Sequence, residues 1–148
     1  MMTIKQLYND EKINQILELW NQNVKETADC ELDKSERDAL EEQIKQYTQS
    51  TYGAVFVVIN EQDQLVGYGI ASMKQDLVSD IVYGQIDEVY VAPQYRRQKM
   101  AKHLVNDLMD WFHQNAVSFI HVQVDLENES ALHFWERMGL EKEFIVLS

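Results

Sequence analysis

The stretch "IDEVYVAPQYRRQKMAKHLVNDLMDWF", from Ile86 to Phe112, joins an apolar, strand-like run to an amphipathic helix. Pro93, the only proline of the chain, ends the apolar run, because proline has no N–H to give to a strand ladder. Apolar residues then recur at helical spacing, at Ala101, Leu104, Val105, Leu108, Trp111 and Phe112. The stretch therefore predicts a strand, a turn and a helix, which begin a βαβ unit with parallel strands.

Cations crowd this turn, at Arg96, Arg97, Lys99 and Lys102. The chain as a whole is acidic, with 13 Lys and Arg against 25 Asp and Glu and a net charge of −12. A helix N-terminus offers free backbone N–H groups and the positive end of the helix dipole, and no Ser, Thr, Asp or Asn between Arg96 and Lys99 can cap it. Unpaired cations there cost ~0.3–1 kcal/mol each, so we expect a bound anion such as a phosphate.

The strand before the turn has a break in its alternation. Val89 and Val91 share one parity, and Ile86 has the other, so a strict period of two cannot bury all three. A β-bulge near Asp87 and Glu88 would reconcile them, and the alternative is an exposed Ile86. Bulges are frequent beside active sites, where they redirect a side chain.

The strands of the chain are predicted from β-rich runs. They lie at Ile4–Tyr8, Ala54–Asn60, Leu65–Ser72, Tyr83–Val91 and Ser118–Leu126, with a last short one at residues 143–148. Helices are predicted after Asp10 as a cap, after Asp33 with Glu36 as a capping box, and after Asn128, with Gly139 as a left-handed C-terminal cap. We therefore expect a mixed α/β fold, with one single-layered sheet of about six to seven strands flanked by four helices, in one domain over residues 1–148.

Several classes of function are disfavoured by composition. A nucleic-acid partner is not expected, because one small basic cluster in an acidic chain is a poor footprint for phosphates. No apolar run reaches the length of a membrane span, and the N-terminus lacks the apolar core of a secretory signal. Cys30 stands alone, which excludes an intramolecular disulfide and suits a cytoplasmic protein. The four histidines form no metal-binding spacing, so no metal is expected.

Two segments resemble the motifs of a known family. "VYVAPQYRRQKMAKHLV" is similar to motif A of the GNAT N-acetyltransferases, and "NESALHFWERMGL", from Asn128 to Leu140, is similar to motif B. The order of the predicted elements also resembles that family over essentially the whole chain. The resemblance implies a GNAT-like acyltransferase fold and acetyl-CoA as co-substrate.

The resemblance also implies which residues hold the cofactor. The pyrophosphate would lie on the turn residues Arg96, Arg97, Gln98, Lys99, Met100, Ala101 and Lys102. The pantetheine arm would pair with the strand backbone around Val89 and Val91, and Asn128 would hydrogen-bond the arm. Trp135 would shape the thiol end of the tunnel.

Two positions depart from the family pattern. Lys99 replaces a glycine that lets the backbone approach the pyrophosphate or adopt a positive φ. Trp135 replaces a tyrosine that is often assigned as the acid for the departing thiolate. An indole N–H donates only a hydrogen bond, so the thiolate would leave without that acid, and the identity of any replacement stays open.

The chemistry of amine acetylation points to the predicted bulge. Glu88 is our candidate general base, and Asp87 is the candidate for holding the cationic acceptor. We expect transfer of the acetyl group to a primary amine of a small, cationic acceptor by direct attack in a ternary complex, by a monomer or a homodimer. The alternative is a weakly active or inactive acetyl-CoA-binding sensor or partner-recognition module. The acceptor itself stays open among aminoglycosides, polyamines, amino acids and protein amines.

Overall fold

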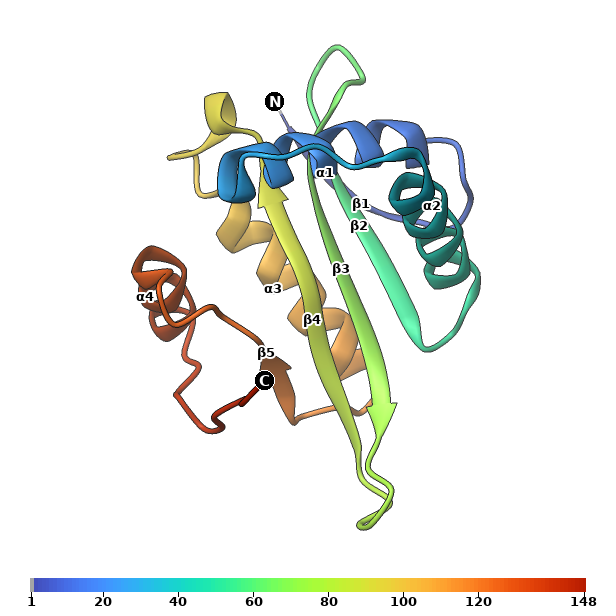
Figure 1. Ribbon diagram of the computed structural model, residues 1–148. Helices are drawn as coiled ribbons and strands as arrows, with labels where there is room; N and C mark the ends of the chain where they lie inside the picture. The colour runs from blue at the N-terminus through green and yellow to red at the C-terminus, as the bar shows by residue number, and fades with distance from the viewer. Residues whose placement is uncertain (1) are drawn as a thin grey trace.

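The computed structural model describes residues 2–148, and Figure 1 shows their arrangement. In chain order the elements are β1 (Thr3–Leu7), α1 (Ile13–Ala28), α2 (Lys34–Gln49), β2 (Gly53–Ile59), β3 (Leu65–Gln75), β4 (Val82–Val91), the 3₁₀ turn η1 (Pro93–Tyr95), α3 (Met100–Gln114), β5 (Ile120–Val122) and α4 (Glu129–Arg137).

Within the described residues, the sheet has five strands in the order β1-β2-β3-β4-β5. The first four are antiparallel neighbours, and β5 lies parallel to β4, which confirms the predicted parallel unit. The mixed α/β class and the four helices are confirmed, whereas the expected six to seven strands are wrong. Residues 143–148 form no strand, and β5 is only three residues long instead of spanning residues 118–126. A three-residue edge offers too few backbone groups to hold a further strand.

Helices cover both faces of the sheet (Figure 1). On one face, α1 and α2 pack against the strands through a cluster that includes Ile16, Ile44 and Tyr68. On the other face, α3 contributes Leu108 and Phe112 to a second cluster, which α4 joins. The approach of α3 to β4 requires Gly84, because a Cβ there would overlap the Phe112 ring. Strand β4 therefore lies between two apolar layers. One of its faces packs toward α1 and α2, and the other packs toward α3.

The predicted caps are mostly confirmed. Asp33 and Glu36 form the capping box of α2, and the Asn128 side chain caps α4 by accepting from the Ala131 N–H at 3.1 Å. Gly139, with φ of 98°, follows α4 in the left-handed region. The expected Asp10 cap is wrong.

Helix α1 begins at Ile13 with Lys12 as its N-cap and no side-chain cap. Residues just before it form a turn in which the Asn9 side chain accepts from the Glu11 N–H. Asp10 contributes only its backbone carbonyl, which accepts from the Ile13 N–H.

The predicted bulge in β4 is confirmed. Ile70 of β3 pairs with Glu88, but the next residue, Ala71, pairs with Ile86, so Asp87 is the extra residue. The extra residue lets Ile86 and Val89 both reach the α3 side of the sheet, where Ile86 is buried. The bulge thus resolves the break in alternation that the sequence shows.

Candidate active site

The bulge turns two consecutive carboxylates toward the same face of the sheet. The Asp87 carboxylate accepts hydrogen bonds from the Ser72 hydroxyl at 2.8 Å and from Gln85 Nε2 at 2.5 Å, and it lines a cavity with residues of α1 and α2. Glu88 Oε1 accepts from Nδ2 of Asn23, a residue of α1, at 3.4 Å. In a regular strand these neighbours would point to opposite faces. The structure therefore brings together the two carboxylates that the sequence singled out.

Glu88 has an unusual acidity for a glutamate. Burial, together with the negative charge of Asp87, raises the pKa of Glu88 to about 7, against the opposing hydrogen bond from Asn23. Desolvation has this sign because a carboxylate loses hydration when it is buried. A carboxyl group with a pKa near 7 can take up and release a proton at neutral pH, as a general base requires.

A buried tyrosine, Tyr68, lies near Glu88 on this face. The Tyr68 side chain of β3 is fully buried, and its hydroxyl has no hydrogen-bond partner within residues 2–148. Trp20 of α1 stacks on the Tyr68 ring, with centroids 5.4 Å apart and planes 7° from parallel. Burial, and then the charge of Glu88, raise the pKa of Tyr68. Neither Asn23 nor Tyr68 was a candidate from the sequence, because a lone asparagine on a helix and a tyrosine in an apolar strand carry no motif.

The edge of β4 that faces β5 is open beyond the bulge. Pairing with β5 ends at Ile86 and Val122, and Figure 1 shows β4 continuing past the short β5. The Ala92 N–H donates to the Val66 carbonyl of β3 at 2.8 Å. Because N–H directions alternate along a strand, the N–H groups of Val89 and Val91 point away from β3, toward the open edge.

The turn after β4 has the backbone form for which glycine is suited. Arg97 and Lys99 both lie in the left-handed region, with φ of 70° and 60°. Lys99 is the N-cap residue of α3, and no side chain of the described residues caps this helix. Lys99 therefore adopts, at a steric cost of ~1–2 kcal/mol, a conformation that glycine would adopt freely.

The four cations of the turn divide into two groups. The Arg96 guanidinium pairs with Glu26 of α1 at 3.0 Å, donates from Nε to the Val91 carbonyl at 2.9 Å, and lies 5.3 Å from the centre of the Tyr90 ring. Burial tends to raise the pKa of Glu26, but hydrogen bonds from Tyr90 and Arg96, with the charge of Arg96, together lower it. Arg96 thus ties the turn to α1.

The other three cations of the turn, Arg97, Lys99 and Lys102, are exposed. Within residues 2–148 they form no ion pair and no side-chain hydrogen bond. Gln98 is exposed beside them, and the next residues, Met100 and Ala101, are half-buried at the start of α3. The structure therefore leaves three charges and an uncapped helix start facing solvent together.

The two motif B residues lie on the opposite side from Glu88. The Asn128 side chain caps α4 and also accepts from the Ser130 hydroxyl at 3.2 Å. Trp135 is 8% exposed and packs in the apolar cluster that α3 shares with α4. The structure thus gives both residues a structural role in α4, and it separates them from the carboxylates on the α1 and α2 side.

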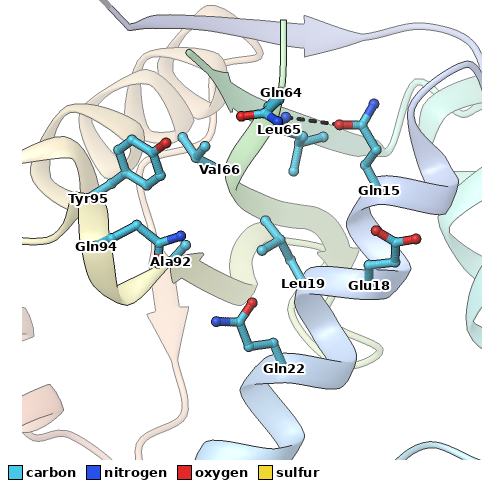
Figure 2. Close-up of a pocket in the computed structure, with 10 residues that line it drawn as sticks. All are labelled: Gln15, Glu18, Leu19, Gln22, Gln64, Leu65, Val66, Ala92, Gln94 and Tyr95. Carbon is cyan, nitrogen blue, oxygen red and sulfur yellow. Dashed lines mark hydrogen bonds between the residues drawn. The ribbon is translucent and has the colours of Figure 1, made fainter. Parts of the chain in front are cut away.

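A larger cavity lies on the α1 side of the turn, and Figure 2 shows its lining. Its volume is about 260 Å³, and its polar wall is formed by Glu18, Tyr95 and four glutamines, Gln15, Gln22, Gln64 and Gln94. Gln15 accepts from the Leu65 N–H at 3.0 Å, which fixes α1 to the start of β3 (Figure 2). None of the site residues predicted from the sequence lines this cavity. Its wall comes from segments that are far apart in the chain, so no single motif marks it.

Residues 2–148 contain neither a metal-binding cluster nor a membrane-spanning helix. No group of three or more His, Cys, Asp or Glu side chains in this part of the chain is placed to hold a metal ion. No helix in the same residues is long and apolar enough to cross a membrane.

Comparison with known proteins places the geometry in context. Residues 13–140 match the sequence profile of the family described as the acetyltransferase (GNAT) family. No curated protein matches the chain by sequence at a significant level.

Solved structures share the fold at low sequence identity. An aminoglycoside 6'-N-acetyltransferase from Acinetobacter baumannii is 17% identical, with a TM-score of 0.81 over 100% of this chain and 96% of that one. An aminoglycoside N-acetyltransferase in complex with CoA, AAC(6')-Iy, is 18% identical, with a TM-score of 0.80 over 100% and 93%. A four-substitution variant of a Bacillus halodurans protein is 16% identical, with a TM-score of 0.82 over 99% and 97%.

Proposed function

We propose, from the premise that this chain belongs to the GNAT acetyltransferase family, that it transfers the acetyl group of acetyl-CoA to a primary amine of a small cationic molecule. The observation that carries the proposal is the bulge in β4, which sets a half-buried carboxylate with a pKa of about 7 on a strand with an open edge. The same strand leads into the uncapped, cationic start of α3. Each part corresponds to a need of the reaction.

On the cofactor side, the turn supplies what a pyrophosphate requires. Arg97, Lys99 and Lys102 carry charge that no carboxylate of the described chain neutralises, and the N–H groups at the start of α3 lack a side-chain acceptor. We assign the pyrophosphate to these residues with Gln98, Met100 and Ala101. Arg96 has a smaller direct role in this scheme, because it is already paired with Glu26.

The acyl end of the cofactor would lie along β4. The N–H groups of Val89 and Val91 point to the open edge, so they can pair with the pantetheine arm and polarise the thioester carbonyl. Asn128 and Trp135 would contact the arm only where α4 approaches it. The buried position of Trp135 supports a packing role, with no proton donated to the thiolate.

On the acceptor side, Glu88 would act as the general base. A protonated amine gives its proton to Glu88, directly or through a water molecule, and the neutral nitrogen attacks the thioester carbonyl. The aminoglycoside acetyltransferases among the structural neighbours support a small amine as the acceptor, at the level of the fold. The net charge of −12 favours a cationic acceptor at long range.

The test is turnover. Purified protein is incubated with acetyl-CoA and a panel of aminoglycosides, polyamines, amino acids and alkyl amines, and CoA thiol release is followed together with the mass of the product. We expect a mass gain of one acetyl group on at least one cationic amine. Binding of acetyl-CoA without turnover on any amine would favour the alternative of a sensor module and would refute the proposal.

A further inference from the structure

A second, smaller cavity lies directly beside Asp87, on the α1 and α2 side of the bulge. Its volume is about 90 Å³, and its wall includes Trp20 of α1, Leu40 and Tyr47 of α2, and Ile70 of β3. A cavity of this size has room for only a few non-hydrogen atoms. It therefore suits the end of a slim chain better than a sugar ring.

The wall combines one carboxylate with aromatic and aliphatic surface. Asp87 is held in place by Ser72 and Gln85, which use two of the roughly four lone-pair positions of the carboxylate. Burial, and then the charge of Asp87, raise the pKa of Tyr47, which places this charge close to the Tyr47 hydroxyl. An anchored carboxylate beside aromatic faces is a combination that recognises an ammonium group.

This cavity and Glu88 lie on the same face of the sheet. Asp87 and Glu88 are consecutive residues that the bulge turns to the same face. Trp20, which lines the cavity, and Asn23, which contacts Glu88, lie one turn apart on α1. Trp20 also stacks on Tyr68, the buried neighbour of Glu88. A ligand with two nitrogens a few bonds apart can therefore reach both carboxylates.

We propose that the Asp87 pocket, formed by Asp87, Trp20, Leu40, Tyr47 and Ile70, binds a second ammonium group of the acceptor, so that short linear diamines are the preferred substrates. The inference rests on the proposed acetyltransferase function. One nitrogen of the diamine stays protonated in the Asp87 pocket. The other nitrogen gives one proton to Glu88 and attacks the thioester; a C–N bond forms, the C–S bond breaks, and CoA leaves as the thiolate. The second proton that the attacking nitrogen loses passes to the thiolate or to water.

The kinetic test compares diamines with monoamines of equal length. Alkyl diamines with two to five carbons between the nitrogens and the matching alkyl monoamines are assayed with the wild type and with Asp87→Asn. Because the pocket contributes a charge-assisted contact, we expect kcat/KM for the best diamine to exceed that of its monoamine by about 10- to 100-fold. Asp87→Asn should remove this advantage, and because the charge of Asp87 also acts on Glu88, the readout is the ratio of diamine to monoamine kcat/KM within each protein.

Two further variants separate the pocket from general charge and packing. Asp38→Asn removes the same charge from an exposed position on α2, where the side chain makes no hydrogen bond or ion pair within residues 2–148, and it should keep the diamine preference. Trp20→Phe keeps an aromatic face and should retain most of the preference, whereas Trp20→Leu should lose part of it. Thermal unfolding of each variant checks that the fold is intact.

A binding measurement decides the inference even without turnover. Calorimetry with 1,4-diaminobutane and 1-aminobutane should show tighter binding of the diamine to the wild type, and equal binding of the two to Asp87→Asn. If no amine is acetylated but this pattern holds, the proposed function fails and the Asp87 pocket stands. If the monoamine binds and reacts as well as the diamine, or if Asp87→Asn weakens both alike, the diamine assignment is wrong.

Discussion

The bulge at Asp87 and Glu88 and the turn from Arg96 to Lys102 belong to the same strand-to-helix unit, and they carry opposite charges. At the bulge, the structure gives each carboxylate a donor, namely Ser72 and Gln85 for Asp87 and Asn23 for Glu88. At the turn, the Arg96 side chain has an ion pair and a hydrogen bond. The side chains of Arg97, Lys99 and Lys102 have neither within residues 2–148.

This difference indicates how the two halves of the proposed site are prepared. The carboxylates are positioned before any ligand arrives, which suits groups that must meet a reacting atom with correct geometry. The free cations have no such framework, and a phosphate would supply the missing partner. The acceptor side is therefore preorganised, and the cofactor side is completed by its ligand.

The largest expected effect concerns the carboxylate that acts as base. Glu88→Gln keeps the shape of the side chain and removes its basicity, so kcat at neutral pH should fall by ~10²–10⁴. The measurement is initial rate at saturating acetyl-CoA with the best amine. Glu42→Gln, at an exposed position of α2, is the matched control and should stay near the wild-type rate. A Glu88→Gln enzyme with wild-type kcat would leave this residue at most a binding role.

The next effect concerns the unpaired cations. Replacing Arg97 and Lys102 together by alanine removes two charge-assisted contacts, so KM for acetyl-CoA should rise about 10- to 100-fold with a smaller change in kcat. Lys142→Ala, an exposed lysine near the C-terminus, serves as the control. Arg96→Ala should raise this KM less, because its partner is Glu26. An unchanged KM in the double variant would show that the pyrophosphate does not bind at this turn.

A third effect concerns stability and its dependence on pH. The pKa of Glu88 in the folded protein is about 7, above the usual value of 4.5. The folded state then holds its proton in a range where the unfolded state has lost it, so stability decreases as pH rises from about 4.5 to about 7.

Glu88→Gln removes this titration and should stabilise the protein by roughly 1–3 kcal/mol at pH 8 relative to the wild type, with little gain at pH 4.5. Urea unfolding at the two pH values measures the difference. A stabilisation that is equal at both values would mean that the pKa of Glu88 is not raised in the folded state.

The smallest effect concerns Lys99 and the backbone of the turn. Lys99→Gly relieves the strain of a left-handed residue but adds backbone entropy to the unfolded chain, so the free energy of unfolding should change by no more than ~1 kcal/mol. Lys99→Val keeps the strain and adds a β-branched side chain, and it should lower stability by at least ~1 kcal/mol. Thermal unfolding compares the two. A larger loss in the glycine variant would show that the lysine side chain, and not the backbone form, supports the turn.

The parts of the fold that follow from local sequence were predictable. The bulge followed from the parity of Ile86 and Val89, and the caps at Asp33 and Asn128 followed from residue types that bond a nearby backbone N–H. The prediction of Asp10 as a cap was wrong because the Asn9 side chain, one residue earlier, accepts the hydrogen bond from the Glu11 N–H in the turn before α1.

The prediction of a strand at residues 143–148 was wrong for a different reason. A strand depends on a partner edge, and the three-residue length of β5 is not visible in the apolar alternation of residues 118–126. An apolar pattern predicts that a segment can pair, and only the neighbouring strand decides whether it does.

The candidate site was predictable where motifs carried it and not elsewhere. Glu88 and the cationic turn were identified from the stretch that opens the fold, because a break in alternation and an uncapped helix start are local signals. The pairing of Arg96 with Glu26, and the contacts of Glu88 with Asn23 and Tyr68, join segments far apart in the chain. No local pattern encodes such contacts, because they arise only when α1 packs on the sheet.

The most direct test of the account is the pH dependence of kcat/KM for the amine, measured with the wild type and with Glu88→Gln at saturating acetyl-CoA. If Glu88 is the base, the wild-type profile should show an ionisation near pH 7, below which the rate falls as the carboxylate becomes protonated. The glutamine variant should lack this ionisation, and its lower rate should rise steadily with pH as free amine accumulates. Profiles with the same ionisation in both proteins would contradict the assignment of Glu88 as the base.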